Sequence, residues 1–361
     1  MANWTVTAPT PTETLQAQIY AREAFLEGRV KSFWGNWMGK GQNNVIQVDE
    51  SFTQQPGSAI NFSIVQDITS RGIAGSAIQS YHPYHDTNKR LEGQEASIST
   101  YSDSVLLDQL REAVITGGTL SEQRSSLDQR RYMKETLAYW VERIMIDEFI
   151  FKKLSGVTFT DKNGNTVGEA ATTNSKVLYG GGKTARNQLT ASDTFTLGLL
   201  QTAHTFAKVG DSSLWRMRPI PINGGKYFGC VLHNYQIDSL QRSEQWERIH
   251  RDASMRGPDN PLFTGAKGLY NNVLIYEHDK VVTGSDAGPG GDEPYASAIF
   301  FGLQAGLWAQ AQPAPNWVEK TFDYMDMPGI ATGMVFGFDR AKFNSKDFGV
   351  IKIETSARPP A

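Results

Sequence analysis

The chain has 361 residues, enough to bury one large core or two modest ones, and its 39% hydrophobic and 20% charged residues are typical of a folded protein. A formal net charge of -3 without a dense run of Lys and Arg argues against a protein that binds nucleic acid mainly through phosphates. With Cys230 as its single cysteine, the chain can form neither an intramolecular disulfide nor a cysteine-based zinc site.

Residues 1–45 are predicted to form an N-terminal arm. Met1 to Gln18 is polar and lacks the basic start and apolar block of a signal peptide, so we expect the protein to stay in the cytoplasm where it is made. Trp34 and Trp37 stand among glycines in this arm, where they would be costly to leave in water because an aromatic side chain can bury on the order of 150–250 Å². They are predicted either to dock on their own chain or to lie in a subunit interface.

Residues 46–107 have the pattern of an extended β-hairpin with little apolar content. Ile60, Phe62 and Ile64 alternate with polar residues, as in a strand buried on one face, and Ala96–Val105 is a second, more polar run. A hairpin of this kind is marginal in isolation and needs a partner surface. We therefore predict either an extended intermolecular element or a covered edge hairpin within one domain.

A long helix is predicted from about 119 to 155. Thr119 and Glu122 fit a capping box at its start, and Gly156 stands where a helix commonly ends. Apolar residues recur at helical spacing along it: Leu127, Leu137, Val141, Ile144, Met145, Phe149 and Leu154. A helix of about 35 residues would be roughly 50 Å long, which exceeds the usual length in a compact protein, so it needs a sheet to lie on.

The C-terminal half mixes helices and strands without a regular βαβ rhythm, which predicts the α+β class. A second helix is expected from Ser192 or Asp193 to Val209, and its shared face is predicted to carry Phe195, Leu199, Ala203 and Phe206. A polar helix is expected over Gln236–Ala253. The predicted strands are Lys226–His233, Asn272–Tyr276, Thr332–Phe338 and Gly349–Thr355.

The sequence Gly180-Gly181-Gly182-Lys183-Thr184 ends like a phosphate-binding P-loop. The full motif requires a further glycine where this chain has Val177, and the residues after Thr184 are polar and not clearly helical. A flexible loop is therefore the favoured interpretation. A phosphate-binding enzyme that uses Gly180–Thr184 remains an alternative, which nucleotide binding lost in Lys183→Ala would support.

Three other groups of residues have side chains of the kinds found in chemical sites. His82 and Asp86 lie in a segment with no regular element to fix metal-ligand geometry, so an interface turn is favoured. Asp323 and Asp326 precede Pro328-Gly329, where a loop explains them without catalysis. Cys230 lies in an apolar run and is predicted to be a buried small hydrophobe. We accordingly predict no catalytic, cofactor-binding or metal site, and a protein that is not an enzyme.

Several short sequence motifs, in a particular order along most of the chain, resemble those of one protein family. They are Trp37-Met38-Gly39-Lys40-Gly41, Asn44-Val45-Ile46-Gln47-Val48, Leu91-Glu92-Gly93-Gln94-Glu95, Asp108-Gln109-Leu110-Arg111-Glu112-Ala113-Val114, Leu120-Ser121-Glu122-Gln123-Arg124, Gly229-Cys230-Val231-Leu232-His233, Asn272-Val273-Leu274-Ile275-Tyr276-Glu277 and Phe301-Gly302-Leu303-Gln304-Ala305. In this order they are similar to the major capsid family of N-four-type podophages. The arm, hairpin, long helix and mixed C-terminal half also resemble the Hong Kong 97 type of tailed-phage capsid subunit.

This resemblance implies a major capsid protein that self-assembles into hexamers and pentamers of an icosahedral shell around double-stranded DNA. It implies an arm (1–45), an extended loop (46–107), a peripheral domain with the long helix (108–191), an axial domain (192–321) and C-terminal strands that return to the peripheral domain (322–361). The expected partners are further copies of the chain, a portal protein, a possible cement or decoration protein, and packaged DNA held by non-specific contact. Assembly is expected in the bacterial host cytoplasm.

The extended loop of such subunits lies over a neighbour, which implies contacts between subunits for the charged residues Arg71, Lys89, Arg90 and Glu92. With Trp34 and Trp37, these are the predicted interface residues. Only some 45 residues precede the first strand, too few for a long fused scaffolding segment, so a separate scaffolding protein is expected. The competing interpretations are an encapsulin-like cellular compartment, and a binding module or tail protein that forms trimers or fibres.

Overall fold

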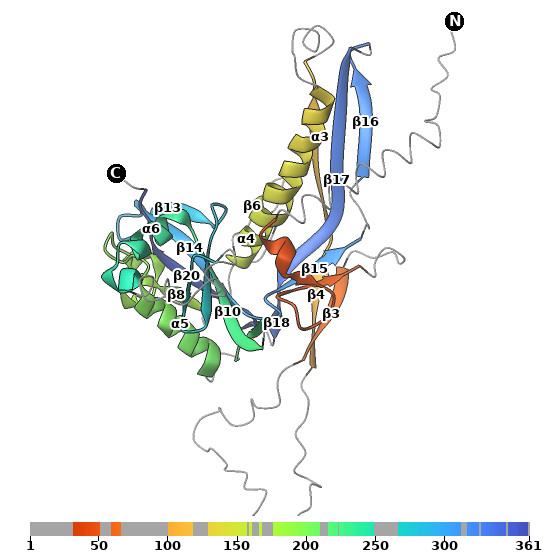
Figure 1. Cartoon of the computed structure of the whole chain (residues 1–361). Coiled ribbons are helices and arrows are strands. Elements are labelled where there is room, and N and C mark those ends of the chain that lie inside the picture. Colours follow the sequence, from red (N-terminus) through yellow and green to blue (C-terminus); the bar gives the residue numbers. More distant parts are fainter. Residues whose placement is uncertain are drawn as a thin grey trace, which may run out of the picture.

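The computed structural model describes residues 32–50, 59–65, 100–117, 129–156, 159–160, 166–167, 176–209, 216–222, 224–248, 266–311, 316–324, 326–343 and 346–359. These residues form an elongated part and a compact body, each built on its own sheet, and the elongated part projects from the compact body (Figure 1). The mixture of helices and sheets agrees with the predicted α+β class.

The sheet of the elongated part is organised around one long strand. In order it contains β1 (Met38–Gly39), β2 (Ile46–Asp49), β15 (Gly306–Gln310), β17 (Met327–Arg340) and β16 (Asn316–Phe322), and β5 (Asp108–Ile115) also pairs with β17. Alternate residues of β17 point to the same face. On one face Ile330, Met334, Phe336 and Phe338 are buried in the core.

The long helix covers that face, as predicted, and consists of α3 (Gln129–Trp140), a π-helical stretch η4 (Val141–Glu148) and α4 (Phe149–Leu154). Its end agrees with the prediction, and Gly156 follows with a positive φ of 68°. The predicted start at Thr119 lies outside the described residues.

The π-helical stretch changes which side chains of the helix are buried. Along one row of buried apolar residues, the spacing is four up to Val141, then five to Ile146, and then four again at Ile150 and Leu154. Because a π-helix adds one residue to the turn, the buried face moves by one position. Ile144, which was predicted to lie on the apolar face, is instead 41% exposed.

The compact body is built on a second sheet. In order it contains β11 (Gly268–Tyr270), β12 (Val273–Glu277), β10 (Gly225–Leu232), β14 (Glu293–Phe301), β20 (Val350–Ser356) and β8 (Val177–Tyr179), with β13 (Thr283–Ala287) beside β14 and β9 (Ile220–Ile222) beside β10. The central strand β10 is apolar throughout its second half because both of its faces are covered: Cys230 lies in one hydrophobic cluster and Val231 in another.

Two helices of the compact body depart from their predicted bounds. The helix α5 (Leu197–Val209) begins after Thr196, whose hydroxyl accepts from the backbone N–H of Leu199. Its buried face carries Leu200, Ala203 and Ala207, whereas Phe206 is 38% exposed, so the predicted face was wrong at Phe206. The helix α6 (Asn234–Gln241) ends well before Ala253, and a turn at 242–243 separates it from helical residues 244–248.

The remaining elements are short. The hairpin of β3 (Ala59–Val65) and β4 (Thr100–Leu106) matches the two predicted strands where it is described, and β4 runs on through Leu107 into β5. The other pieces are β6 (Phe159–Thr160) with β7 (Thr166–Val167), β18 (Lys342–Phe343) with β19 (Lys346–Asp347), and the 3-10 turns η1 (Trp34–Trp37), η5 (Gly180–Gly182) and η6 (Arg186–Gln188).

The chain passes between the two sheets more often than predicted. Strands β15 and β16 fall in the range assigned to the axial domain, yet they belong to the elongated sheet. The C-terminal strands were expected to return to the peripheral domain (108–191). Of these strands, β17 pairs with β5 and β20 pairs with β8, both of which lie in that range, and β20 also pairs along seven residues with β14 in the compact body.

Candidate interaction surfaces

The glycine-rich loop Gly180–Thr184 lacks the structure of a phosphate-binding loop. The 3-10 turn η5 follows β8 directly, and the next described helical element is the 3-10 turn η6 rather than an α-helix. Gly181 has a φ of 62° and lies so close to Asp193 that an added Cβ would meet its carboxylate oxygen at 1.9 Å. A carboxylate packed against the loop would repel a phosphate, so the glycines serve close packing and a tight turn.

The other chemical candidates have structural roles where they are described. Cys230 is completely buried in β10, and this burial raises the pKa of its thiol, which makes it a poor nucleophile. His233 caps α6, and its ring accepts from the backbone N–H of Tyr235. Asp323 begins the turn between β16 and β17, and its carbonyl accepts from the N–H of Asp326. His82 and Asp86 lie outside the described residues.

No cluster of three or more metal-ligating side chains occurs among the residues that the structure describes. Within the same residues, no helix combines the length and the apolar character needed to cross a membrane. The features that stand out are surfaces.

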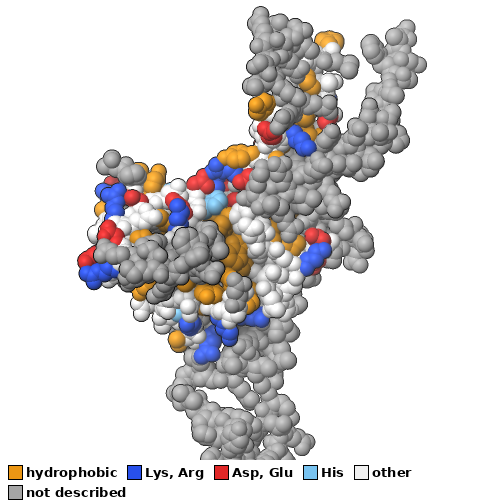
Figure 2. Space-filling model, in the orientation of Figure 1, with side chains coloured by type: hydrophobic (Ala, Val, Ile, Leu, Met, Phe, Trp, Pro, Cys, Tyr) orange, Lys and Arg blue, Asp and Glu red, His pale blue; other side chains and the backbone are white. Residues whose placement is uncertain are grey.

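The first surface is the open face of the three strands β5, β17 and β16. Met133 and Leu137 of α3 pack on the opposite face, over Ile330. On the open face, Ile115 is 58% exposed, Val318 52% and Phe322 42%. Hydrophobic side chains reach the surface of the elongated part in Figure 2.

The pairing of the strands explains how this open face is formed. Ile115 of β5 lies opposite Gly329 of β17, and Val318 of β16 lies opposite Ala331. An added Cβ on Gly329 would meet both Ile115, at 2.8 Å, and Phe322, at 2.9 Å. Small residues in the central strand therefore let larger side chains of the outer strands lean over it, and Lys320 of β16, which pairs with Gly329, shares this face. We call Ile115, Val318, Phe322 and Ala331 the open face.

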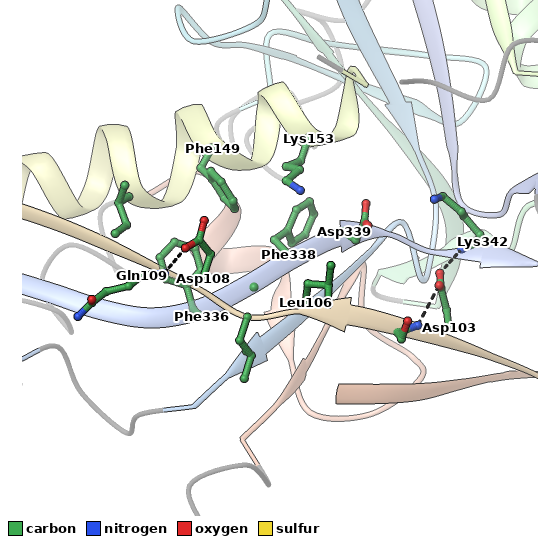
Figure 3. Close-up of a pocket in the computed structure, with 14 residues that line it drawn as sticks. Asp103, Leu106, Asp108, Gln109, Phe149, Lys153, Phe336, Phe338, Asp339 and Lys342 are labelled. Atoms are coloured by element: carbon green, nitrogen blue, oxygen red, sulfur yellow. Dashed lines mark hydrogen bonds between the residues drawn. The ribbon is translucent and has the colours of Figure 1, made fainter. Parts of the chain in front are cut away.

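The second surface lies where the β3–β4 hairpin leaves the elongated sheet (Figure 3). Gly337 permits this crossing, because an added Cβ would lie 2.2 Å from the carbonyl oxygen of Leu106. A cavity of about 710 Å³ opens beside it, between α4, β17 and the β4–β5 strand. Phe149, Phe336 and Phe338 line its interior.

Charged groups of both signs surround the mouth of this cavity. Burial raises the pKa of Asp339, against the opposing charge of Lys153. Burial lowers the pKa of Lys342, although Asp103 counters it, and Asp103 also accepts from the backbone N–H of Lys342 at 3.0 Å. These contacts hold the root of the hairpin against β17 and β18. Leu106, at the same root, is 74% exposed.

The predicted interface residues divide into three groups. Trp34 is completely buried by its own chain, between Phe151 and Phe301, so the prediction that it contacts another subunit was wrong for this side chain. Trp37 packs edge-on against Tyr276 and keeps part of its surface accessible. Arg71, Lys89, Arg90 and Glu92 lie outside the described residues.

No sequence pattern indicated the contact that fixes Trp34. Asp147, in the π-helical stretch, is 2% exposed and accepts from the backbone N–H groups of Phe33 and Trp34 at 3.1 and 3.2 Å. His278 lies 3.4 Å from the same carboxylate, and its ring packs between Phe33 and Phe151. One buried carboxylate thus joins the N-terminal segment, the long helix and the compact body.

Comparisons with known proteins agree on one kind of relative. A family model described as phage capsid protein matches residues 10–358. The major capsid protein of Pseudomonas phage KPP25 is 25% identical over 377 aligned residues, which cover 95% of each chain. The solved capsid of Ralstonia phage GP4 is 29% identical with a TM-score of 0.75, and the match covers 91% of this chain and 92% of that one.

A more distant structure shows the same fold. The capsid asymmetric unit of cyanophage Pam1 is 17% identical, with a TM-score of 0.68 over 99% of this chain and 96% of that one. At this identity the likeness concerns the fold alone.

Proposed function

The chain belongs to the phage capsid protein family and forms the shell of a phage capsid as its major capsid protein, and from that premise we propose that its copies assemble as hexamers and pentamers of a closed icosahedral shell around double-stranded DNA. Its fold is of the Hong Kong 97 type, as the sequence resemblance implied. These relationships favour a phage shell over an encapsulin-like compartment, and they favour a structural role over a phosphate-binding enzyme.

In this proposal the elongated part is the peripheral domain and the compact body is the axial domain. The β3–β4 hairpin and the residues beyond it lie over a neighbouring subunit, where Arg71, Lys89, Arg90 and Glu92 pair across the interface, and the accessible edge of Trp37 adds to a contact. A separate scaffolding protein, a portal protein and a cement or decoration protein complete the particle. Assembly takes place in the host cytoplasm.

The open face is the observation that carries the proposal of contact between copies. Ile115 of β5 and Val318 and Phe322 of β16 remain exposed in the single chain on either side of β17, while the opposite face of these strands is covered by α3. Burying apolar surface is worth roughly 25 cal/mol per Å², so a neighbouring copy gains free energy by covering this face. The chain's own packing leaves this surface for assembly.

The test replaces Ile115, Val318 and Phe322 together with Thr, which removes apolar surface but keeps a strong strand preference. Assembly with a candidate scaffolding protein is followed by size-exclusion chromatography and negative-stain microscopy. We expect the triple variant to fold and to form few or no shells. Val209→Thr is the matched control, because Val209 is 54% exposed in the compact body and should tolerate the change. Normal shells from the triple variant would refute the role of the open face.

A further inference from the structure

One edge of the compact body carries positive charge that the described residues leave uncompensated, although the whole chain has a net charge of -3. Lys208, Arg216, Arg218 and Lys226 are the only Lys, Arg, Asp or Glu residues described between Thr194 and Ile237. In Figure 2, Lys and Arg side chains gather along the lower edge of the compact body, below α5 and β10, where no acidic side chain is drawn. We call these four residues the basic stripe.

Neighbouring elements hold the four cations together. The segment 216–218 runs beside the end of α5, because the N–H of Met217 donates to the carbonyl of Ala207 at 2.9 Å. The same segment continues into β9, and Lys226 lies opposite Pro221 in the β9–β10 pair. The stripe therefore begins at the last turn of α5 and follows an extended chain to the end of the sheet.

The extended segment orients its arginines outward. Side chains alternate along extended backbone, and Met217 is 4% exposed, which leaves Arg216 and Arg218 on the opposite, solvent side.

Among the described residues, the hydrogen-bond partners of Arg216 and Arg218 are neutral. Arg216 donates to the carbonyl of Val209 at 3.4 Å, and Arg218 donates to the side-chain oxygen of Asn43 at 3.3 Å. Elsewhere in the compact body, exposed cations are matched with carboxylates, as in the pairs of Arg242 with Asp238 and Arg248 with Glu244. The basic stripe is thus a local departure from the pattern of the surrounding surface.

We propose that the basic stripe binds the phosphate backbone of double-stranded DNA without regard to sequence. The four cations contact phosphates and release counterions, which favours binding at low salt. Backbone contacts of this kind position a duplex but read no bases, as suits a surface that meets every part of a long DNA. The inference rests on the proposed function only because the shell brings the DNA to this surface.

The test measures binding of the purified, unassembled chain to a fluorescent 30-base-pair duplex of arbitrary sequence. With four phosphate contacts, the logarithm of the association constant should fall with the logarithm of salt at a slope near -3.6, or roughly 150-fold between 50 and 200 mM. The variant K208E/R216E/K226E should lose binding by more than tenfold at 50 mM salt. Circular dichroism and thermal melting establish that it folds.

The matched control is R242E/R248E/K267E, which makes the same charge change at exposed, carboxylate-paired positions of the compact body. We expect it to bind DNA more tightly than the stripe variant by at least tenfold. Equal losses in both variants would overturn the proposal, because only net charge would then matter. Binding of polyglutamate but not of the duplex would also overturn it, in favour of an acidic protein partner.

Shell formation is scored separately by negative-stain microscopy, so the two proposals fail independently. Shells that form from the stripe variant, together with lost duplex binding, support a DNA-binding stripe. Shell loss with unchanged duplex binding would overturn it and make the stripe a contact between subunits. If the wild-type chain forms no shells but shows the expected salt slope, the proposed assembly fails while the stripe proposal stands.

Discussion

The compact body and the elongated part differ in how completely their strands are buried. In the compact body, all seven residues of β20 are buried, and β14 is buried from Tyr295 to Phe301. In the elongated part, β5 and β16 contain no buried residue, and only one face of their sheet is covered by α3. The comparison shows that the chain covers both faces of these strands in the compact body but leaves one face of β5 and β16 exposed in the elongated part, the face that we propose a neighbouring copy covers.

If this contrast is correct, truncating a core side chain of the compact body should have the largest effect on stability. Phe300 is completely buried in the hydrophobic cluster between the sheet and α5. Phe300→Ala should lower the free energy of unfolding by about 3–5 kcal/mol, because it removes buried surface and leaves a cavity. Chemical denaturation of the unassembled chain measures this loss. Val318→Ala in the elongated part should lower the free energy of unfolding by less than about 0.5 kcal/mol. Comparable losses in Phe300→Ala and Val318→Ala would contradict the proposed difference between the two parts.

A smaller effect is expected from the buried ion pair of the compact body. Glu354 is 1% exposed and receives two hydrogen bonds from Arg186, at 2.7 and 2.9 Å, while Lys352 lies 2.7 Å away. Burial alone would raise the pKa of Glu354, but Arg186 and Lys352 outweigh it and hold this pKa below the ordinary value of 4.5. Because Arg186 is about a third exposed, Glu354→Gln should lower the free energy of unfolding by about 2–3 kcal/mol. This loss is smaller than the one expected when a fully buried ion pair is broken.

The direction of this pKa shift also predicts a pH dependence. A carboxyl group with a lowered pKa in the folded state contributes stability above its unfolded pKa and loses it as the pH falls through the folded pKa. The free energy of unfolding should therefore decline below about pH 4.5, and the decline should be shallower in Glu354→Gln. Urea denaturation between pH 3 and pH 7 measures both curves. Parallel curves for the two proteins would show that Glu354 does not contribute to acid stability.

The sequence predicted the parts of the fold that depend on local pattern. The apolar run of β10 indicated a buried strand, and Gly156 marked the end of the long helix. The exposed position of Ile144 could not be predicted, because a single extra residue in a π-helical turn shifts every later side chain. The pairing of β20 with β14 likewise depends on packing between distant segments rather than on either strand alone.

The candidate surfaces were predicted less well than the fold. Trp34 was assigned to an interface or to the core on its chemistry alone, and only the position of Asp147 in three dimensions places it in the core. The open face gave a weak signal because Ile115 lies in β5 and Val318 and Phe322 lie in β16, and the two strands share a face only after β17 pairs with both of them. Composition could not reveal the basic stripe, since a net charge of -3 averages over the whole chain.

The smallest effect on stability, and the sharpest test of the contrast, is expected at Arg90. This residue lies in the segment between β3 and β4, where the proposed function places contacts with a neighbouring subunit. Arg90→Glu should change the free energy of unfolding of the unassembled chain by less than about 0.5 kcal/mol, as is usual for a surface substitution, yet it should impair capsomer assembly because charges across the interface would repel. Analytical ultracentrifugation and negative-stain microscopy measure assembly. Arg248→Glu, at an exposed position of the compact body, is the control and should assemble normally. Normal assembly of Arg90→Glu would mean that this charge is not used between subunits, and the dependence of the elongated part on its neighbours would then rest on the apolar open face.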